Sequence, residues 1–282
     1  MKKKLSYRDK LIELAYIYDV KEIKDYEKSR KSLTSGQLEL ILRKNKICHF
    51  DIKGDNILFD NQKKLPIIID FGLSIDTTTI SLNNLTKFFY VFAPEYYFWP
   101  LEVHYLNFLL HKNINPSKQD LQNIAKEYTN NNRALLPFSD KFKIKFQRLC
   151  YVQLKYYNNI DEIVKRINLL LNYWKTWDNY GISIMFLKII RYIYYNNGFT
   201  KNKFITFFTQ LLLKNMHPDP QSRMSPIQTL QFFNTFLNNK DINNISTFKD
   251  ITDLFIKNRT LISKKITNEL KLNELLTTRI MV

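Results

Sequence analysis

Residues 49–72 read HFDIKGDNILFDNQKKLPIIIDFG, and this stretch decides which fold the rest of the chain must complete. Lys46–Cys48, just before it, and Ile57–Phe59 within it predict two short strands, and a polar turn follows the second. Leu65–Ile69 is apolar and β-branched, which predicts a buried strand. A strand–turn–strand unit of this length brings Asn56 and Asp70 to neighbouring strand ends.

Four polar residues of this stretch have the chemistry that phosphoryl transfer to a hydroxyl needs. The carboxylate of Asp51 can accept the proton of an attacking hydroxyl, and the ammonium group of Lys53 can neutralise charge on the moving phosphoryl group. Asn56 and Asp70 offer oxygen ligands, which Mg²⁺ prefers. The spacing therefore indicates a reaction class as well as a fold.

The order H-x-D-x-K-x-x-N followed by D-F-G resembles the catalytic and metal-binding loops of eukaryotic-type protein kinases. The resemblance implies a serine/threonine protein kinase that uses ATP and Mg²⁺. It implies Asp51 and Lys53 as catalytic residues, Lys53, Asn56 and Asp70 as ATP-binding residues, and Asn56 and Asp70 as metal ligands. The implied fold is mainly α (α+β): a helical C-terminal lobe with a small β hairpin at the catalytic site.

Two motifs further along extend the resemblance. Residues 93–95 read A-P-E, as at the end of a kinase activation segment, and residues 219–223 carry a D-P-x-x-R element. The family pattern implies that Arg223 pairs with Glu95. Such a buried pair costs about 3–5 kcal/mol to break on one side.

Residues 176–183, TWDNYGIS, resemble the start of the large buried helix of the kinase C-lobe. The resemblance implies that Asp178 holds the backbone of the catalytic loop by hydrogen bonds. Gly181 comes two positions early, and Ser183 stands where the family glycine usually lies.

Two substitutions depart from the family pattern. Phe50 stands where most kinases carry the arginine that binds an activation-loop phosphate, which predicts activity independent of such a phosphate. Phe88 replaces the threonine that usually precedes A-P-E, so no consensus substrate follows from the sequence.

The N-terminal side is short for a kinase. A five-stranded N-lobe with one helix needs roughly 70 residues, and 48 precede His49. Thr34–Leu42 and Leu11–Tyr18 read as helices, and no G-x-G-x-x-G or V-A-I-K-like strand is present. An N-lobe upstream or on another polypeptide, a kinase with a reduced N-lobe, and a pseudokinase used as a binding module all remain open.

These observations divide the chain into three parts. Residues 1–33 form an N-terminal helical segment, residues 34–238 the C-lobe, and residues 239–282 a helical extension with expected helices at Leu254–Ile266 and Leu270–Leu276. Within this chain we expect the N-lobe to be absent or strongly reduced.

A helical insert is expected at about residues 97–173, between A-P-E and the TWDNYGIS stretch. It begins apolar and aromatic, continues through a polar Asn-rich stretch at residues 113–132, and ends in helical runs at Phe142–Tyr157 and Ile160–Trp174. A set of its apolar residues is expected in the core rather than in a partner groove: Tyr97, Trp99, Leu101, Val103, Tyr105, Leu106 and Leu109. Substrate docking by the insert is the alternative.

Composition sets the remaining limits. No run of 18 apolar residues occurs, so no transmembrane helix is expected, and two cysteines fit a reducing compartment. The net charge of +17 fits acidic partners or nucleic acid, although a Lys/Asn/Ile bias from an AT-rich genome explains it too.

This bias, together with HFDIKGDN and FYVFAPEYYFWPLEVH, resembles the protein kinases of large DNA viruses. That resemblance implies the host cytoplasm or the virion, and otherwise the cytoplasm is expected. Protein substrates are expected, with a non-catalytic protein- or nucleic-acid-binding scaffold as the alternative and a small-molecule kinase as a further one.

Overall fold

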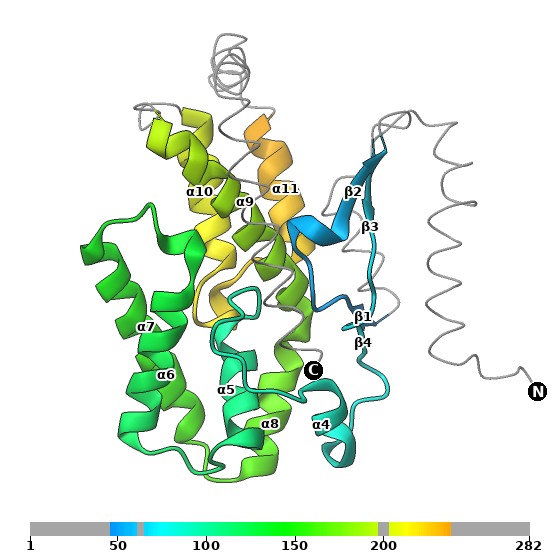
Figure 1. Cartoon of the computed structure of the whole chain (residues 1–282), viewed down its shortest axis with the longest axis vertical. Coiled ribbons are helices and arrows are strands. Elements are labelled where there is room, and N and C mark those ends of the chain that lie inside the picture. The colour runs from blue at the N-terminus through cyan, green and yellow to red at the C-terminus, as the bar shows by residue number, and fades with distance from the viewer. Residues whose placement is uncertain (1–45, 61–64, 197–202, 238–282) are drawn as a thin grey trace, which may run out of the picture.

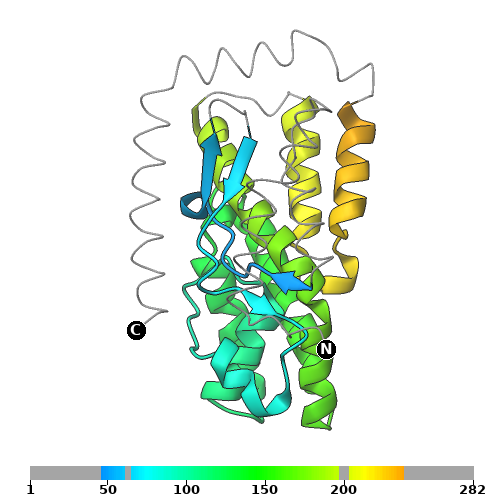
Figure 2. The same ribbon diagram turned by 90° about the vertical axis from the view of Figure 1, so that its right-hand side faces the viewer.

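The computed structural model describes residues 46–60, 65–196 and 203–237. This part of the chain is mainly helical, with two small sheets, and is compatible with the α+β class. The strands lie together on one side of the helices (Figures 1 and 2). The helices expected at Leu11–Tyr18, Thr34–Leu42, Leu254–Ile266 and Leu270–Leu276 lie outside the described residues.

Each of the two sheets has two antiparallel strands. Strand β2 (Ile57–Asp60) pairs with β3 (Leu65–Ile68), and β1 (Ile47–Cys48) pairs with β4 (Ile75–Asp76). The strands expected at β1, β2 and β3 are therefore confirmed. Strand β4 was not predicted, because it lies in a polar stretch and its pairing with β1 depends on the fold rather than on local pattern.

The expectation that the strand at residues 65–69 is buried was wrong for the described side chains. Ile67 is 42% exposed, and its cross-strand partner Leu58 is 53% exposed. Directly opposed residues point to the same face of a sheet. The β2–β3 hairpin therefore presents an apolar face among the described residues, because no helix of this part packs over it.

The helices account for most of the described chain, and short 3-10 turns connect several of them. In chain order they are α4 (Leu85–Phe88), α5 (Leu101–His111), α6 (Lys118–Asn131), α7 (Asp140–Asn158), α8 (Ile163–Leu171), α9 (Trp177–Asn196), α10 (Lys203–Asn215) and α11 (Pro226–Leu237). The helical runs expected before residue 174 are confirmed as α7 and α8.

Helix α6 occupies most of the Asn-rich stretch that the sequence indicated only as polar. Ser117 caps it, accepting a hydrogen bond from the backbone N–H of Asp120 while the Asp120 carboxylate accepts from the Ser117 N–H. Leu121, Ile124 and Tyr128 recur at helical spacing and are buried. The helix forms because this stripe packs against α7.

Helix α5 lies at the centre of the core, with buried residues on every side. The apolar residues expected in the core are all buried: Tyr97, Trp99, Leu101, Val103, Tyr105, Leu106 and Leu109. Within the described ranges, none of the helices combines the length and apolar character that a membrane crossing requires.

Candidate active site

Asp178 anchors the loop that follows β1. It lies in the first turn of α9, and its carboxylate accepts hydrogen bonds from the backbone N–H groups of His49 at 2.8 Å and Phe50 at 2.9 Å. Cys48 Sγ donates at 3.4 Å. Burial raises the pKa of the Asp178 carboxyl, while the neighbouring His49 and the two N–H groups oppose that rise. The predicted role of Asp178 as a holder of the loop backbone is confirmed.

The anchored backbone turns sharply at Phe50, whose φ of 68° lies in the left-handed region. The Phe50 ring stacks on Trp99 with 5.0 Å between centroids, and Trp99 Nε1 donates to the Phe50 carbonyl at 3.0 Å. Phe50 thus packs into the core, where it holds the loop by contacts instead of presenting a charge.

The turn delivers Asp51 to a buried position with donors on both carboxylate oxygens. Oδ2 accepts from Lys53 Nζ at 3.0 Å and from Asn56 Nδ2 at 2.8 Å, and Oδ1 accepts from the Tyr96 hydroxyl. Asp51 is 1% exposed and Lys53 2%. The loop therefore brings together three of the four predicted site residues.

Burial raises the pKa of the Asp51 carboxyl, and the Lys53 ammonium, through its charge and its hydrogen bond, opposes that rise. A carboxylate with a raised pKa holds a proton better than an ordinary aspartate. This is the direction that a proton acceptor requires.

The β2–β3 hairpin places Asp70 beside this loop. Ile69 N donates to the Asn56 carbonyl at 2.9 Å, which continues the strand register, and Asp70 follows at once. His49 Nε2 also contacts the Ile69 carbonyl, at 3.1 Å. Asp70 has a positive φ of 61° and is exposed, and its Oδ1 accepts from Gly72 N at 3.1 Å.

Asn56 and Asp70 suit a magnesium ion that is completed by other ligands. The Asn56 amide nitrogen donates to the carbonyl and to the carboxylate of Asp51, so the amide oxygen is the atom that would bind the metal ion. Asp70 adds an exposed carboxylate. Among the described residues no group of three or more His, Cys, Asp or Glu could hold a metal ion. Two protein oxygens fit Mg²⁺ that is bound mainly by phosphate and water.

Gly181 lies where α9 crosses the loop. A Cβ at this position would stand 3.1 Å from the carbonyl oxygen of Ile52, the residue between Asp51 and Lys53. The glycine therefore permits the close approach of the helix to the loop. Ser183, at the position where the family glycine usually lies, donates to Asn179 O in its own helix.

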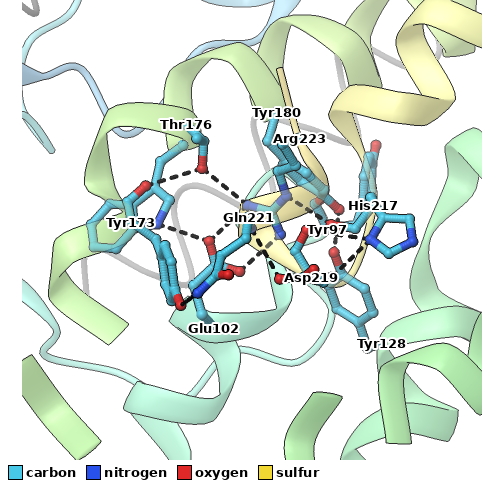
Figure 3. A network of polar contacts seen from close by, with 11 residues as sticks. Tyr97, Glu102, Tyr128, Tyr173, Thr176, Tyr180, His217, Asp219, Gln221 and Arg223 are labelled. Atoms are coloured by element: carbon cyan, nitrogen blue, oxygen red, sulfur yellow. Dashed lines mark hydrogen bonds and ion pairs between the residues drawn. The ribbon is translucent and has the colours of Figure 1, made fainter. Parts of the chain in front are cut away.

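Arg223 pairs with Glu102, so the expected pairing with Glu95 was wrong. Its Nη1 and Nη2 atoms contact the two Glu102 carboxylate oxygens at 2.7 and 2.9 Å, and both side chains are 0% exposed (Figure 3). Trp177 Nε1 donates to the same carboxylate at 3.0 Å. Glu102 enters the core because it lies in the first turn of the buried helix α5, whereas Glu95 precedes that helix and is partly exposed.

Arg223 also draws together the ends of several helices. Its Nε donates to the His217 carbonyl at 2.7 Å, its Nη1 donates to Thr176 at 3.2 Å, and its guanidinium lies 5.4 Å from the centre of the Tyr180 ring (Figure 3). The pair therefore joins α5 to the start of α9 and to the segment before α11.

Sequence reasoning missed Tyr96 and Glu102. For Glu102 a signal was present: a single carboxylate within the apolar run YYFWPLEVHYL has to find a cation when that run is buried. For Tyr96 no signal distinguished it from the neighbouring Tyr97. Comparisons with protein-family models, curated proteins and solved structures found no match.

Proposed function

We propose that the chain has a protein-kinase-like fold and transfers the γ-phosphoryl group of ATP to serine or threonine hydroxyls of proteins. The observation that carries the proposal is the buried carboxylate of Asp51. One of its oxygens accepts hydrogen bonds from both Lys53 and Asn56, within a loop that Asp178 anchors. A carboxylate, an ammonium group and an amide in this order, next to a second carboxylate at a hairpin end, suit phosphoryl transfer.

In the proposed reaction the acceptor oxygen bonds to the γ-phosphorus as the bond to the ADP oxygen breaks, and the acceptor proton moves to Asp51. Lys53 stabilises the charge that develops on the transferring group. Asn56 and Asp70 would hold Mg²⁺, which neutralises phosphate charge when it is bound.

The apolar face of the β2–β3 hairpin supports a nucleotide on the same side. Leu58 and Ile67 are paired and exposed, and they lie two residues after Asn56 and three residues before Asp70, the proposed metal ligands. An exposed apolar pair beside two oxygen ligands can cover a base while phosphates reach the metal. The groups that would close over the nucleotide from the other side would have to come from outside the described residues.

The Glu102–Arg223 pair changes where the activation segment is proposed to end. If this pair corresponds to the glutamate–arginine pair of the family, the segment ends at Pro100–Glu102 rather than at residues 93–95. The segment then contains Tyr96, and the insert begins after residue 102.

The host cytoplasm or the virion, which the resemblance to viral kinases implies as the location, stays a prediction.

The test is transfer of labelled phosphate from ATP with Mg²⁺ to a generic basic protein, with Asp51→Asn and Asp70→Ala beside the unaltered chain. We expect the unaltered chain to transfer phosphate and each substitution to lower the rate at least a hundredfold. Asp51→Asn removes the proton acceptor, and Asp70→Ala removes a metal ligand. Asp140→Asn, on the exposed N-terminus of α7, is the matched control. Transfer that survives both site substitutions contradicts the proposal.

The exposed face of α7 favours the alternative function, a binding scaffold. Ile144 and Val152 are the most exposed large apolar side chains of the described part, at 68% and 57%. Basic and apolar residues alternate along this face without an acid: Lys141, Ile144, Lys145, Arg148, Leu149, Val152, Lys155 and Tyr156.

At about 100° per residue the cations of this face fall between its apolar residues rather than on their flanks. A helix that lies on a membrane has its cations at the flanks. The mixture fits an acidic amphipathic helix of a partner protein better than a bilayer or nucleic acid.

A synthetic helical peptide with a leucine stripe and flanking glutamates would test the α7 face, with Arg148→Glu/Val152→Asp as the altered protein. We expect the unaltered chain to bind the peptide. The double variant should not bind it, and a scrambled peptide of the same composition should not bind the unaltered chain. Equal binding of the scrambled peptide, or binding of duplex DNA alone, would argue against a helical partner at this face.

A further inference from the structure

Both oxygens of the Asp51 carboxylate already accept hydrogen bonds from the chain itself. Lys53 and Asn56 occupy Oδ2, and the Tyr96 hydroxyl donates to Oδ1. Asp51 is 1% exposed and Tyr96 0%. A hydroxyl that is to give its proton to Asp51 must reach one of these oxygens. Because the carboxylate is buried beneath its donors, one of them has to move aside first.

Tyr96 is the donor that can leave without dismantling the loop. Lys53 and Asn56 belong to the loop itself, and Asn56 Nδ2 also holds the Asp51 carbonyl at 2.9 Å. Tyr96 reaches Asp51 from 45 residues along the chain. Its hydroxyl is also of the same chemical kind as the acceptor: an O–H directed at a buried carboxylate.

The backbone on either side of Tyr96 is held independently of that contact. Before it, Asn131 Nδ2 donates to the Pro94 carbonyl at 3.0 Å, and after it Trp99 Nε1 donates to the Phe50 carbonyl at 3.0 Å. Tyr96 itself packs its ring edge-on to Trp99, with 4.8 Å between centroids. Displacing the Tyr96 hydroxyl from Asp51 therefore requires movement of the Tyr96 side chain but breaks neither of these two contacts.

We propose that the Tyr96 hydroxyl occupies the position of the acceptor hydroxyl, so that a serine or threonine substrate must displace it. This inference rests on the proposed function, because only a reaction gives the position its meaning. Tyr96 is then an intramolecular competitor that sets how readily an outside hydroxyl reaches Asp51. It leaves ATP binding at Asn56 and Asp70 untouched.

Tyr96→Phe tests the proposal because it keeps the ring and its packing and removes only the competing hydroxyl. A hydrogen bond to a charged group is worth about 1.5–3 kcal/mol, so we expect kcat/KM for a serine peptide to rise roughly tenfold or more. The KM for ATP should not change. Tyr97→Phe, which loses a hydroxyl that contacts Lys188, is the matched control and should behave like the unaltered chain.

A value of kcat/KM for Tyr96→Phe that is unchanged or lower overturns the inference, since a residue that only orients Asp51 would give a loss. A second readout does not need activity: labelling of the Asp51 carboxyl by a water-soluble carbodiimide and an amine, measured by peptide mass spectrometry. We expect stronger labelling of Asp51 in Tyr96→Phe than in Tyr97→Phe.

The two readouts separate the two proposals. Stronger labelling without phosphate transfer in any variant would support the occupied position of Tyr96 and refute the kinase activity. Transfer by the unaltered chain, with neither labelling nor kcat/KM changed in Tyr96→Phe, would support the activity and refute the role of Tyr96. Unchanged labelling without transfer would refute both.

Discussion

Replacing Glu102 by glutamine should destabilise the chain by about 3–5 kcal/mol, because it leaves the buried Arg223 guanidinium without a counter-charge. The two groups meet through two short hydrogen bonds at 2.7 and 2.9 Å, with neither side chain exposed. Glutamine keeps one oxygen for one of these bonds, but its amide group then faces an Arg223 N–H, donor against donor. The lost charged hydrogen bond alone is worth about 1.5–3 kcal/mol, and the unpaired buried charge adds the rest.

The assay is urea unfolding followed by circular dichroism, which avoids the tryptophan signal because Trp177 contacts Glu102. Glu95→Gln is the matched control: Glu95 is partly exposed, and its loss should cost less than about 0.5 kcal/mol. The double variant Glu102→Met/Arg223→Met should be less destabilised than Glu102→Gln, because an apolar pair removes the uncompensated charge.

A free energy of unfolding for Glu102→Gln within 1 kcal/mol of the unaltered chain would refute this reasoning. So would a Glu95→Gln variant as unstable as Glu102→Gln. Either result would mean that the ion pair does not hold the start of α9 and the segment before α11 against α5.

Two further predictions concern His104 and Gly181. Burial lowers the pKa of His104 from 6.5 to about 4, so about 3 kcal/mol of folding stability is present above pH 6.5 and is lost as the pH falls toward 4, because the unfolded chain takes up a proton that the folded chain does not. In His104→Gln the free energy of unfolding in urea should depend less on pH between 6.5 and 4.5, and an unchanged dependence would contradict this. Gly181→Ala gains about 1 kcal/mol of helix propensity but places a Cβ 3.1 Å from the Ile52 carbonyl oxygen, so the rate of phosphate transfer should fall far more than the stability. Ser183→Ala should leave transfer intact, and equal transfer rates for the two variants would contradict the close contact.

The sequence predicted those parts of the molecule that depend on short-range pattern. Strands β1, β2 and β3 were predicted from short apolar runs, and the role of Asp178 was implied by the resemblance of residues 176–183 to the start of the large kinase helix. The sequence also identified Asp51, Lys53 and Asn56, which lie within five residues of one another and meet in one loop. Local spacing alone is enough to bring such groups together.

What the sequence did not predict depends on which surfaces are covered. Glu95 and Glu102 both sit in an aromatic run, and only the packing of α5 on every side decides that Glu102 is the buried one. Leu58 and Ile67 have the side chains of a buried strand but lie exposed on the hairpin. Helix α6 was not predicted, because its asparagines made the stretch look only polar, whereas the structure buries five of its residues on one helical face.

The polar groups around the loop cost more than apolar residues of the same size would. Asp51, Lys53 and Asp178 are all buried, and burial raises the pKa of both carboxyl groups. Replacing a buried ion pair by well-packed apolar side chains is often neutral or stabilising, so folding alone gives no reason for this arrangement. Groups with perturbed pKa values cluster at functional sites because reaction requires charges where stability does not. The Glu102–Arg223 pair has a structural role instead, because it joins separate helices and its hydrogen bonds go to residues other than Asp51. The charge cluster at Asp51 is therefore the candidate for chemistry, and the pair at Glu102 holds the helices that support it.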